Sequence, residues 1–173
     1  MWLSLIRGLG RLGLGLPRGF WALVAIGWAS WIWYLSTLEG LPIPGTFGWS
    51  WLANTAHAPL FGLLGLWLAF ALPRDGEVTA RGWARLTPRT VGLVLLIVAA
   101  WAGTDEWHQS WVDGRTASLL DWFTDMTGTS VILWIATVAG RSEGAPRMGW
   151  RLALGAVLCF GVSLIATVFS DVI

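Results

Sequence analysis

The chain has 173 residues, of which 55% are hydrophobic and 12% are charged. This composition leaves too little polar surface to cover a soluble globular domain of that length, so it predicts a membrane protein. The formal net charge is +1, which gives no electrostatic support to a nucleic-acid partner. The single cysteine, Cys159, cannot form an internal disulfide, so cysteine usage does not indicate a redox compartment.

Residues 1–18 carry three arginines among leucines and glycines. A signal peptide has a similar composition, but no convincing small-residue cleavage site follows, so we expect an amphipathic lead-in at the membrane interface. Gly8-Leu-Gly-Arg-Leu-Gly13 satisfies the dinucleotide fingerprint in form. No βαβ context surrounds it, and we expect no dinucleotide site there.

Five apolar runs follow along the chain, at about residues 20–38, 52–72, 90–110, 118–139 and 150–170. Each is near the roughly 20 residues that a helix needs to cross about 30 Å of hydrocarbon. The connections are short and rich in glycine and proline, which excludes a soluble module between the spans. The predicted fold is all-α: a polytopic membrane helix bundle of about five transmembrane helices, forming one domain over residues 19–173.

The basic residues are eleven arginines, and ten of them fall in the lead-in or in connections on one side of a five-span chain. The positive-inside rule makes that side cytoplasmic, which predicts an inside amino terminus and an outside carboxyl terminus. The 15 tryptophans are expected to anchor both membrane interfaces and to pack between helices. Stacking of the outer tryptophans on a flat ligand is the alternative.

Ionisable side chains that a bilayer should expel are concentrated around the third and fourth spans. Because charges at membrane depth are costly unless they pair or line a wet cavity, this cluster is a candidate functional site. In an antiparallel bundle, the polar residues of the second, third and fourth spans lie at the same depth, in the outer part of the membrane. There we expect an outward-facing polar pocket formed by His57, Asp105, Glu106, His108, Gln109, Arg115, Asp121 and Asp125.

Helical spacing assigns the residues of the third span to faces. Asp105, His108 and Gln109 share one face through their i, i+3 and i+4 spacing. Glu106 points about 100° away from Asp105.

On the fourth span, Asp121 and Asp125 share a face with Gly128. We expect Gly128 and Gly62 to be packing positions, since small residues let neighbouring backbones approach closely. Arg115, in the loop before this span, is expected to pair with a carboxylate of the third or fourth span, because its guanidinium can hold a carboxylate bidentately.

These residues resemble the pattern of the VanZ-like family of small bacterial integral membrane proteins, named after the teicoplanin-resistance protein. That pattern has a histidine before an apolar helix, Asp-Glu, a glutamine three residues on, Gly-Arg in a loop, then an aspartate and a glycine. Here it becomes His57, Asp105, Glu106, Gln109, Gly114, Arg115, Asp121 and Gly128, within a core of about residues 20–140. The span at 150–170 is additional. Two departures, Asp113 in place of proline and Pro59 after His57, affect local geometry.

The resemblance implies a multi-pass protein of the bacterial inner (cytoplasmic) membrane, belonging to the cell envelope and linked to glycopeptide resistance. Three functions stay open. In the first, the pocket binds or modifies the headgroup of a membrane lipid or of a lipid-linked envelope precursor, or it binds a glycopeptide. In the second, the protein is a non-catalytic accessory subunit of a larger membrane complex with other protein subunits. The third is an intramembrane enzyme with His57, Asp105 and Glu106 in acid/base roles, which we rank last.

Each polar feature also has a structural interpretation. Arg115 and the carboxylates can form an ion-pair network that locks helices together. His57 can simply hydrogen-bond a carboxylate or a carbonyl. We predict no cofactor, and no metal because the spacing of histidines and carboxylates matches no established zinc motif.

Overall fold

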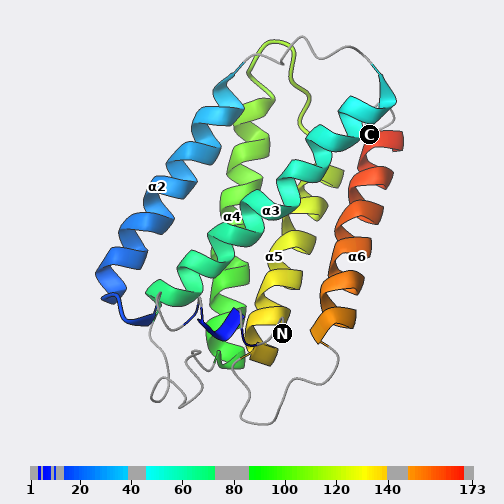
Figure 1. The fold of residues 1–173 in the computed structure, drawn as a ribbon. Helices are drawn as coiled ribbons and strands as arrows, with labels where there is room; N and C mark the ends of the chain where they lie inside the picture. The colour runs from blue at the N-terminus through cyan, green and yellow to red at the C-terminus, as the bar shows by residue number, and fades with distance from the viewer. Residues whose placement is uncertain are drawn as a thin grey trace.

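The computed structural model describes residues 4, 6–8, 10, 14–38, 46–72, 86–139 and 148–169. In these ranges the chain is all-helical, with no strand, which confirms the predicted fold class. The long helices are α2 (Arg18–Thr37), α3 (Phe47–Ala71), α4 (Pro88–Gln109), α5 (Leu119–Ala139) and α6 (Met148–Phe169), and they form one bundle (Figure 1). The segments 39–45, 73–85 and 140–147 lie outside the described residues, as do part of the lead-in and most of the arginines that predict the orientation.

Four of the described helices, α2, α3, α4 and α6, are long and apolar enough to cross a membrane. α5 has a similar length, 21 residues, but its amino-terminal half carries Asp121 and Asp125. It packs against α3, α4 and α6, where a helix with intramembrane carboxylates can turn them toward other helices instead of lipid.

The surface and interior of the bundle suit a membrane. Large hydrophobic side chains lie exposed on the outer helix faces, among them Leu23, Leu96 and Val157. Val94 and Val98 are fully buried between the helices. Exposed apolar surface on this scale would be a liability in water and is expected against lipid chains.

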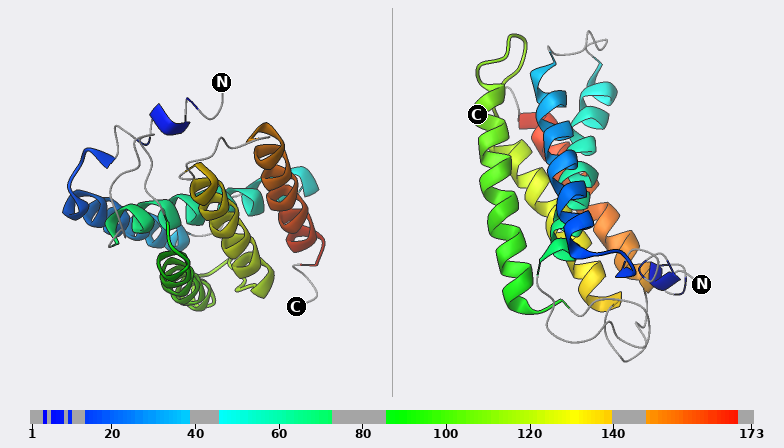
Figure 2. Two further views of the ribbon diagram at one scale, coloured as in Figure 1. Left: turned by 90° about the horizontal axis from the view of Figure 1, so that it is seen from below. Right: turned by 90° about the vertical axis from the view of Figure 1, so that its left-hand side faces the viewer.

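α3 organises the bundle. It crosses the bundle obliquely and packs against α2, α4, α5 and α6 (Figures 1 and 2). Its contact with α5 is made through glycine: a Cβ on Gly128 would collide with the backbone of Ala58, and a Cβ on Gly62 would lie 3.0 Å from the Gly128 carbonyl oxygen. Backbones therefore meet directly at this crossing, next to His57.

Arginine side chains bind the carboxyl ends of several helices. Arg7 Nε donates to the Ala139 carbonyl over 3.1 Å, and Arg18 Nε donates to the Ala71 carbonyl over 3.1 Å. The last carbonyls of a helix lack partners within the helix and carry the negative end of its dipole, so a guanidinium stabilises them.

Candidate functional site

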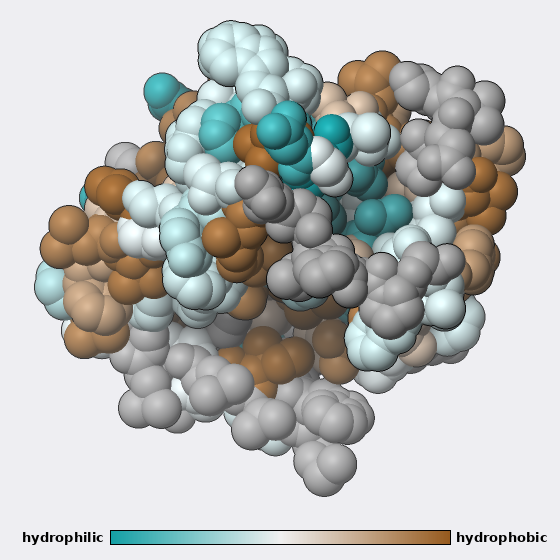
Figure 3. All heavy atoms as spheres, turned by 90° about the horizontal axis from the view of Figure 1, so that it is seen from above, coloured by the Kyte–Doolittle hydropathy of each residue, from teal (hydrophilic) through white to brown (hydrophobic). Residues whose placement is uncertain are grey.

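Polar residues gather at the end of the bundle where α2 and α4 finish and where α3 and α5 begin (Figure 1). Seen from above, hydrophilic residues lie over the middle of this end, and hydrophobic residues lie around the sides (Figure 3). A cavity of about 420 Å³ opens here. Its polar lining consists of Ser36, Asn54, His57, Asp105, Gln109, Arg115, Thr116 and Asp121.

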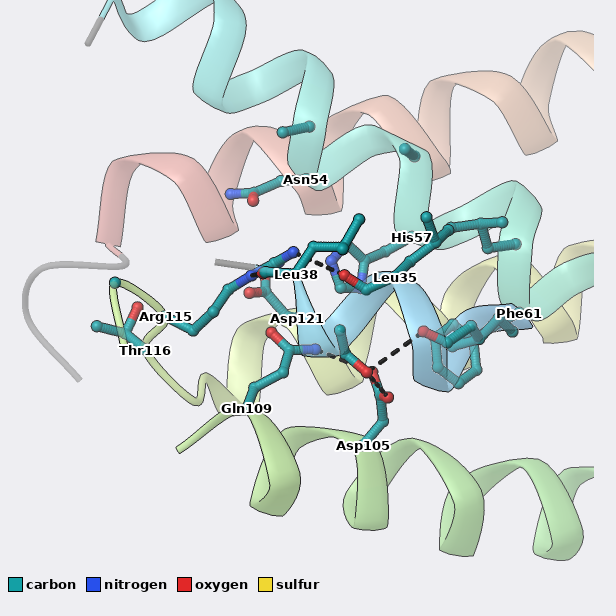
Figure 4. Close-up of a pocket in the computed structure, with 16 residues that line it drawn as sticks. Leu35, Leu38, Asn54, His57, Phe61, Asp105, Gln109, Arg115, Thr116 and Asp121 are labelled. Carbon is teal, nitrogen blue, oxygen red and sulfur yellow. Dashed lines mark hydrogen bonds between the residues drawn. The ribbon is translucent and has the colours of Figure 1, made fainter. Parts of the chain in front are cut away.

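Asp105 is a buried carboxylate with donors on both oxygens. Ser36 Oγ donates to Oδ1 over 2.6 Å, and Gln109 Nε2, one turn along α4, donates to Oδ2 over 2.9 Å (Figure 4). Ser36 belongs to α2, so this pair of bonds joins α2 to α4. Sequence reasoning missed Ser36, because a lone serine near the end of an apolar helix gives no signal of its partner.

His57 and Asp125 link α3 to α5 below the cavity. His57 Nδ1 lies 3.1 Å from Asp125 Oδ1, and the histidine side chain is 17% exposed. Asp125 is completely buried, and its other oxygen, Oδ2, has no hydrogen-bond partner among the described residues. The carboxylate is therefore only half satisfied.

Glu106 fastens the start of α5 to the end of α4. Its Oε2 accepts the backbone N–H of Ser118 over 2.7 Å, and the hydroxyl of Ser118 in turn accepts the N–H of Leu120 over 3.2 Å, as a helix cap does. The second carboxylate oxygen, Oε1, is buried without a partner in the described structure. Glu106 thus combines a positioning contact with a free acceptor.

Asp121 lies one turn before Asp125 on α5 and lines the cavity together with His57. Its Oδ1 is also buried with no hydrogen-bond partner in the part of the chain that the structure describes. Three neighbouring carboxylates therefore each keep one unsatisfied oxygen: Glu106, Asp121 and Asp125.

Arg115 corrects an expectation from the sequence. Instead of pairing with a carboxylate, it donates from Nη2 to the Leu35 carbonyl over 3.0 Å and from Nε to the Leu38 carbonyl over 3.2 Å (Figure 4). Among the described residues, the side chains that form an ion pair are those of His57 and Asp125. Gly114, with a φ of 78°, turns the loop so that the arginine reaches across to the carboxyl end of α2.

The expected pocket residues do not all share one surface. His108 stacks on Trp33, with ring centroids 4.1 Å apart, and is not among the residues that line the cavity. Asp125 lies beneath the cavity lining, since it is fully buried. Glu106 instead lines a second hollow, of about 450 Å³, between α4 and α5, together with Trp107 and other residues.

The tryptophans divide between surface and interior. Trp107 and Trp111 are exposed and pack edge to face at 4.5 Å. Trp122 instead donates from its indole N–H to the Ala99 carbonyl over 3.0 Å, and Trp28 donates to the Leu60 carbonyl over 2.8 Å. Part of the tryptophan content therefore joins helices through indole hydrogen bonds.

Comparison with known proteins identifies the family. The family model described as VanZ/LLP1 matches residues 15–140, which include α2 to α5 and every polar residue of the site described in this subsection. The chain belongs to the VanZ/LLP1 family. This confirms the resemblance found in the sequence, and α6 lies beyond the matched range. No curated protein and no solved structure matches the chain.

In this VanZ/LLP1 protein the polar end offers mainly hydrogen-bond acceptors. Asp105 and Arg115 already have partners, whereas the three unsatisfied carboxylate oxygens face the interior around His57. A buried acceptor left unpaired costs about 1–3 kcal/mol, so a donor or a cation is favoured at this site. His57, Glu106 and Asp125 are also close enough to be considered as metal ligands, since one ligand atom from each lies within 4.8 Å of the others.

Proposed function

We propose that this VanZ/LLP1 membrane protein binds the polar headgroup of an envelope lipid, such as a lipid-linked precursor, in the cavity beside the α4–α5 loop. The observation that carries the proposal is a cavity of about 420 Å³ with a polar lining at one end of an apolar helix bundle. Small-molecule sites typically occupy about 300–1,000 Å³, so the space suits a sugar-sized headgroup.

The chemistry of the lining favours a ligand rich in donors. Asp121 adds a carboxylate to the lining, and Asn54, held by a 3.0 Å bond from its Nδ2 to Thr167 Oγ1, leaves its amide oxygen available. A phosphate alone would meet several carboxylates and be repelled, whereas sugar hydroxyls or an amine would donate to them. A hydroxylated or amine-bearing headgroup is therefore the preferred ligand.

The membrane surroundings supply the second part of the proposal. A bundle with apolar sides holds its polar end at the level of lipid headgroups, so a lipid tail can stay in the bilayer while its headgroup enters the cavity. The arginine distribution in the sequence supports an outward-facing cavity. Reporter fusions at Gly76 and Gly144 should read cytoplasmic, and a periplasmic signal at either position would reverse the orientation.

The binding test is mass spectrometry of lipids that copurify in a mild detergent. The wild type should enrich one headgroup class over the bulk membrane, and Asp121→Asn should lose that enrichment. Asp113→Asn is the matched control, because Asp113 is exposed in the loop between α4 and α5 and does not line the cavity. Lipids at bulk composition in the wild type contradict headgroup binding, and a stoichiometric protein partner found with them would favour the accessory-subunit role.

The link to glycopeptide resistance is tested in cells. If the bound headgroup belongs to the target of glycopeptides, expression of the wild type should raise the minimal inhibitory concentration of teicoplanin. Expression of Asp121→Asn at equal membrane abundance should not. Equal protection by the wild type and by Asp121→Asn would show that resistance does not depend on Asp121 in the cavity.

A further inference from the structure

We infer that His57, Glu106 and Asp125 form a binding site for a divalent transition-metal ion of the Zn²⁺ or Mn²⁺ class. The site lies beneath the cavity, at the junction of α3, α4 and α5. This inference does not depend on headgroup binding, because the three residues would hold the ion without any lipid.

The geometry is that of ligands around one ion. One ligand atom from each residue lies within 4.8 Å of the other two. Metal bonds of about 2.0–2.2 Å place two ligands of one tetrahedral ion roughly 3.3 to 3.6 Å apart, so closing the set needs side-chain shifts of at most about 1.5 Å. The 3.1 Å separation of His57 Nδ1 and Asp125 Oδ1 already fits two adjacent ligands.

The free carboxylate oxygens give independent support. The contact with His57 uses only Oδ1 of Asp125, and it leaves Oδ2 of this fully buried residue without a partner in the described structure. Glu106 Oε1 is in the same state. Asp105, on the same helix as Glu106, is equally buried yet has both oxygens satisfied. Among the buried carboxylates of the described residues, the unpartnered oxygens therefore belong to Glu106, Asp121 and Asp125 around His57, and a cation would satisfy them.

Neighbouring residues support and complete the ligand set. The Ser118 N–H holds Glu106 Oε2 at 2.7 Å and so fixes the direction of the other oxygen, as outer partners of metal ligands do. Asp121, one turn before Asp125, has a buried free oxygen and is a candidate for a fourth ligand. His57 and Asp121 line the cavity and Glu106 lines the side hollow, which gives the ion an entry path.

The ligand types select the class of ion. Imidazole nitrogen suits Zn²⁺ and other transition metals, whereas Mg²⁺ and Ca²⁺ prefer oxygen ligands alone. One histidine with carboxylates therefore indicates Zn²⁺ or Mn²⁺. No metal motif is visible along the chain, because the three ligands come from three separate helices and their spacing reflects only the length of those helices.

The test uses the full chain without a polyhistidine tag, since His57 and His108 are its two histidines. The protein is stripped with a chelator, dialysed and titrated with Mn²⁺ or Zn²⁺, and the bound metal is measured after gel filtration. We expect about one ion per chain. Asp125→Asn and His57→Gln should weaken binding by at least about 10-fold, the effect that loss of even an outer partner produces.

Two controls keep the result specific. His108→Gln should retain wild-type affinity because His108 stacks on Trp33 away from the cluster, and Asp105→Asn should retain it because both Asp105 oxygens already have donors. A wild-type protein that takes up neither Zn²⁺ nor Mn²⁺ overturns the proposal, whether or not the variants fold. Equal losses in the ligand variants and in His108→Gln, or uptake of Mg²⁺ in preference to both metals, overturn it as well.

Discussion

Replacing Gly128 by alanine should force α3 and α5 apart. A Cβ at this position would lie 2.5 Å from Ala58 Cα and 2.6 Å from the Ala58 carbonyl carbon. Those atoms belong to backbone, which cannot rotate away as a side chain can, so the helices themselves must separate. Overpacking of a close-fitting interior typically costs about 1–3 kcal/mol, and a clash with backbone belongs at the upper end of that range.

A loss of about 3 kcal/mol in the free energy of unfolding corresponds to a melting temperature lower by roughly 6–12 °C for a chain of this length. Thermal unfolding in detergent, followed by tryptophan fluorescence, measures it. Because Ala58 follows His57, the displacement should also separate His57 from Asp125 and abolish metal binding. Gly92→Ala is the matched control: nothing lies within 4 Å of a Cβ there, and alanine favours a helix by up to about 1 kcal/mol over glycine.

A melting temperature of Gly128→Ala within about 1 °C of the wild type, a change worth well under 1 kcal/mol, would show that α3 and α5 are not closely packed at this position. Destabilisation of Gly92→Ala to the same degree as Gly128→Ala would show that the effect reflects loss of glycine in any helix. A lower melting temperature with unchanged metal affinity would show that the α3–α5 crossing can open without moving His57.

Three further changes test contacts around the cavity. Ser36→Ala should lower the free energy of unfolding by about 1–3 kcal/mol, because it leaves one Asp105 oxygen buried without a donor. Thr37→Ala, a change at an exposed neighbour, should lower it less in the same thermal assay. Equal losses in the two variants would contradict the role of the bond between α2 and α4. Arg115→Leu should speed hydrogen exchange in the last turn of α2 and leave the middle of α3 unchanged, whereas uniform acceleration would point to global destabilisation. Gly114→Ala should lower stability by about 1–2 kcal/mol because its φ of 78° is left-handed; a neutral result would place the loop in another conformation.

The positions of most helices could be predicted closely, because each membrane-spanning helix is recognised from the length of its apolar run. The expected spans at about 90–110 and 118–139 correspond to α4 (Pro88–Gln109) and α5 (Leu119–Ala139). α3 begins at Phe47, five residues before the expected start at 52. Its first turn, Phe47-Gly-Trp-Ser50, mixes polar and apolar residues, so hydropathy alone does not recognise it as helix.

The composition of the site was predictable, but its contacts were only partly so. The i, i+4 spacing of Asp105 and Gln109 indicated one helix face, and the two side chains are hydrogen-bonded. The i+3 position of His108 indicated the same face, and its ring packs on Trp33 of α2, the helix that also supplies Ser36 to Asp105. Arg115 was expected on a carboxylate because charge suggests that partner, whereas the turn of the loop brings it to carbonyls on α2. Spacing along one helix cannot show which neighbouring helix supplies the partner.

The carboxyl end of α2 forms one wall of the cavity. It is held there by the bond from Ser36 to Asp105, by the bonds from Arg115 to its last carbonyls, and by the stacking of Trp33 on His108. Toward the other end, Trp21 stacks on Trp67 of α3 at 5.1 Å and keeps the two helices together. The contact of His57 with Asp125 joins α3 to α5 and does not involve α2. A substitution at Ser36 or Arg115 therefore alters the rim of the cavity, while the pair beneath it keeps its own contact.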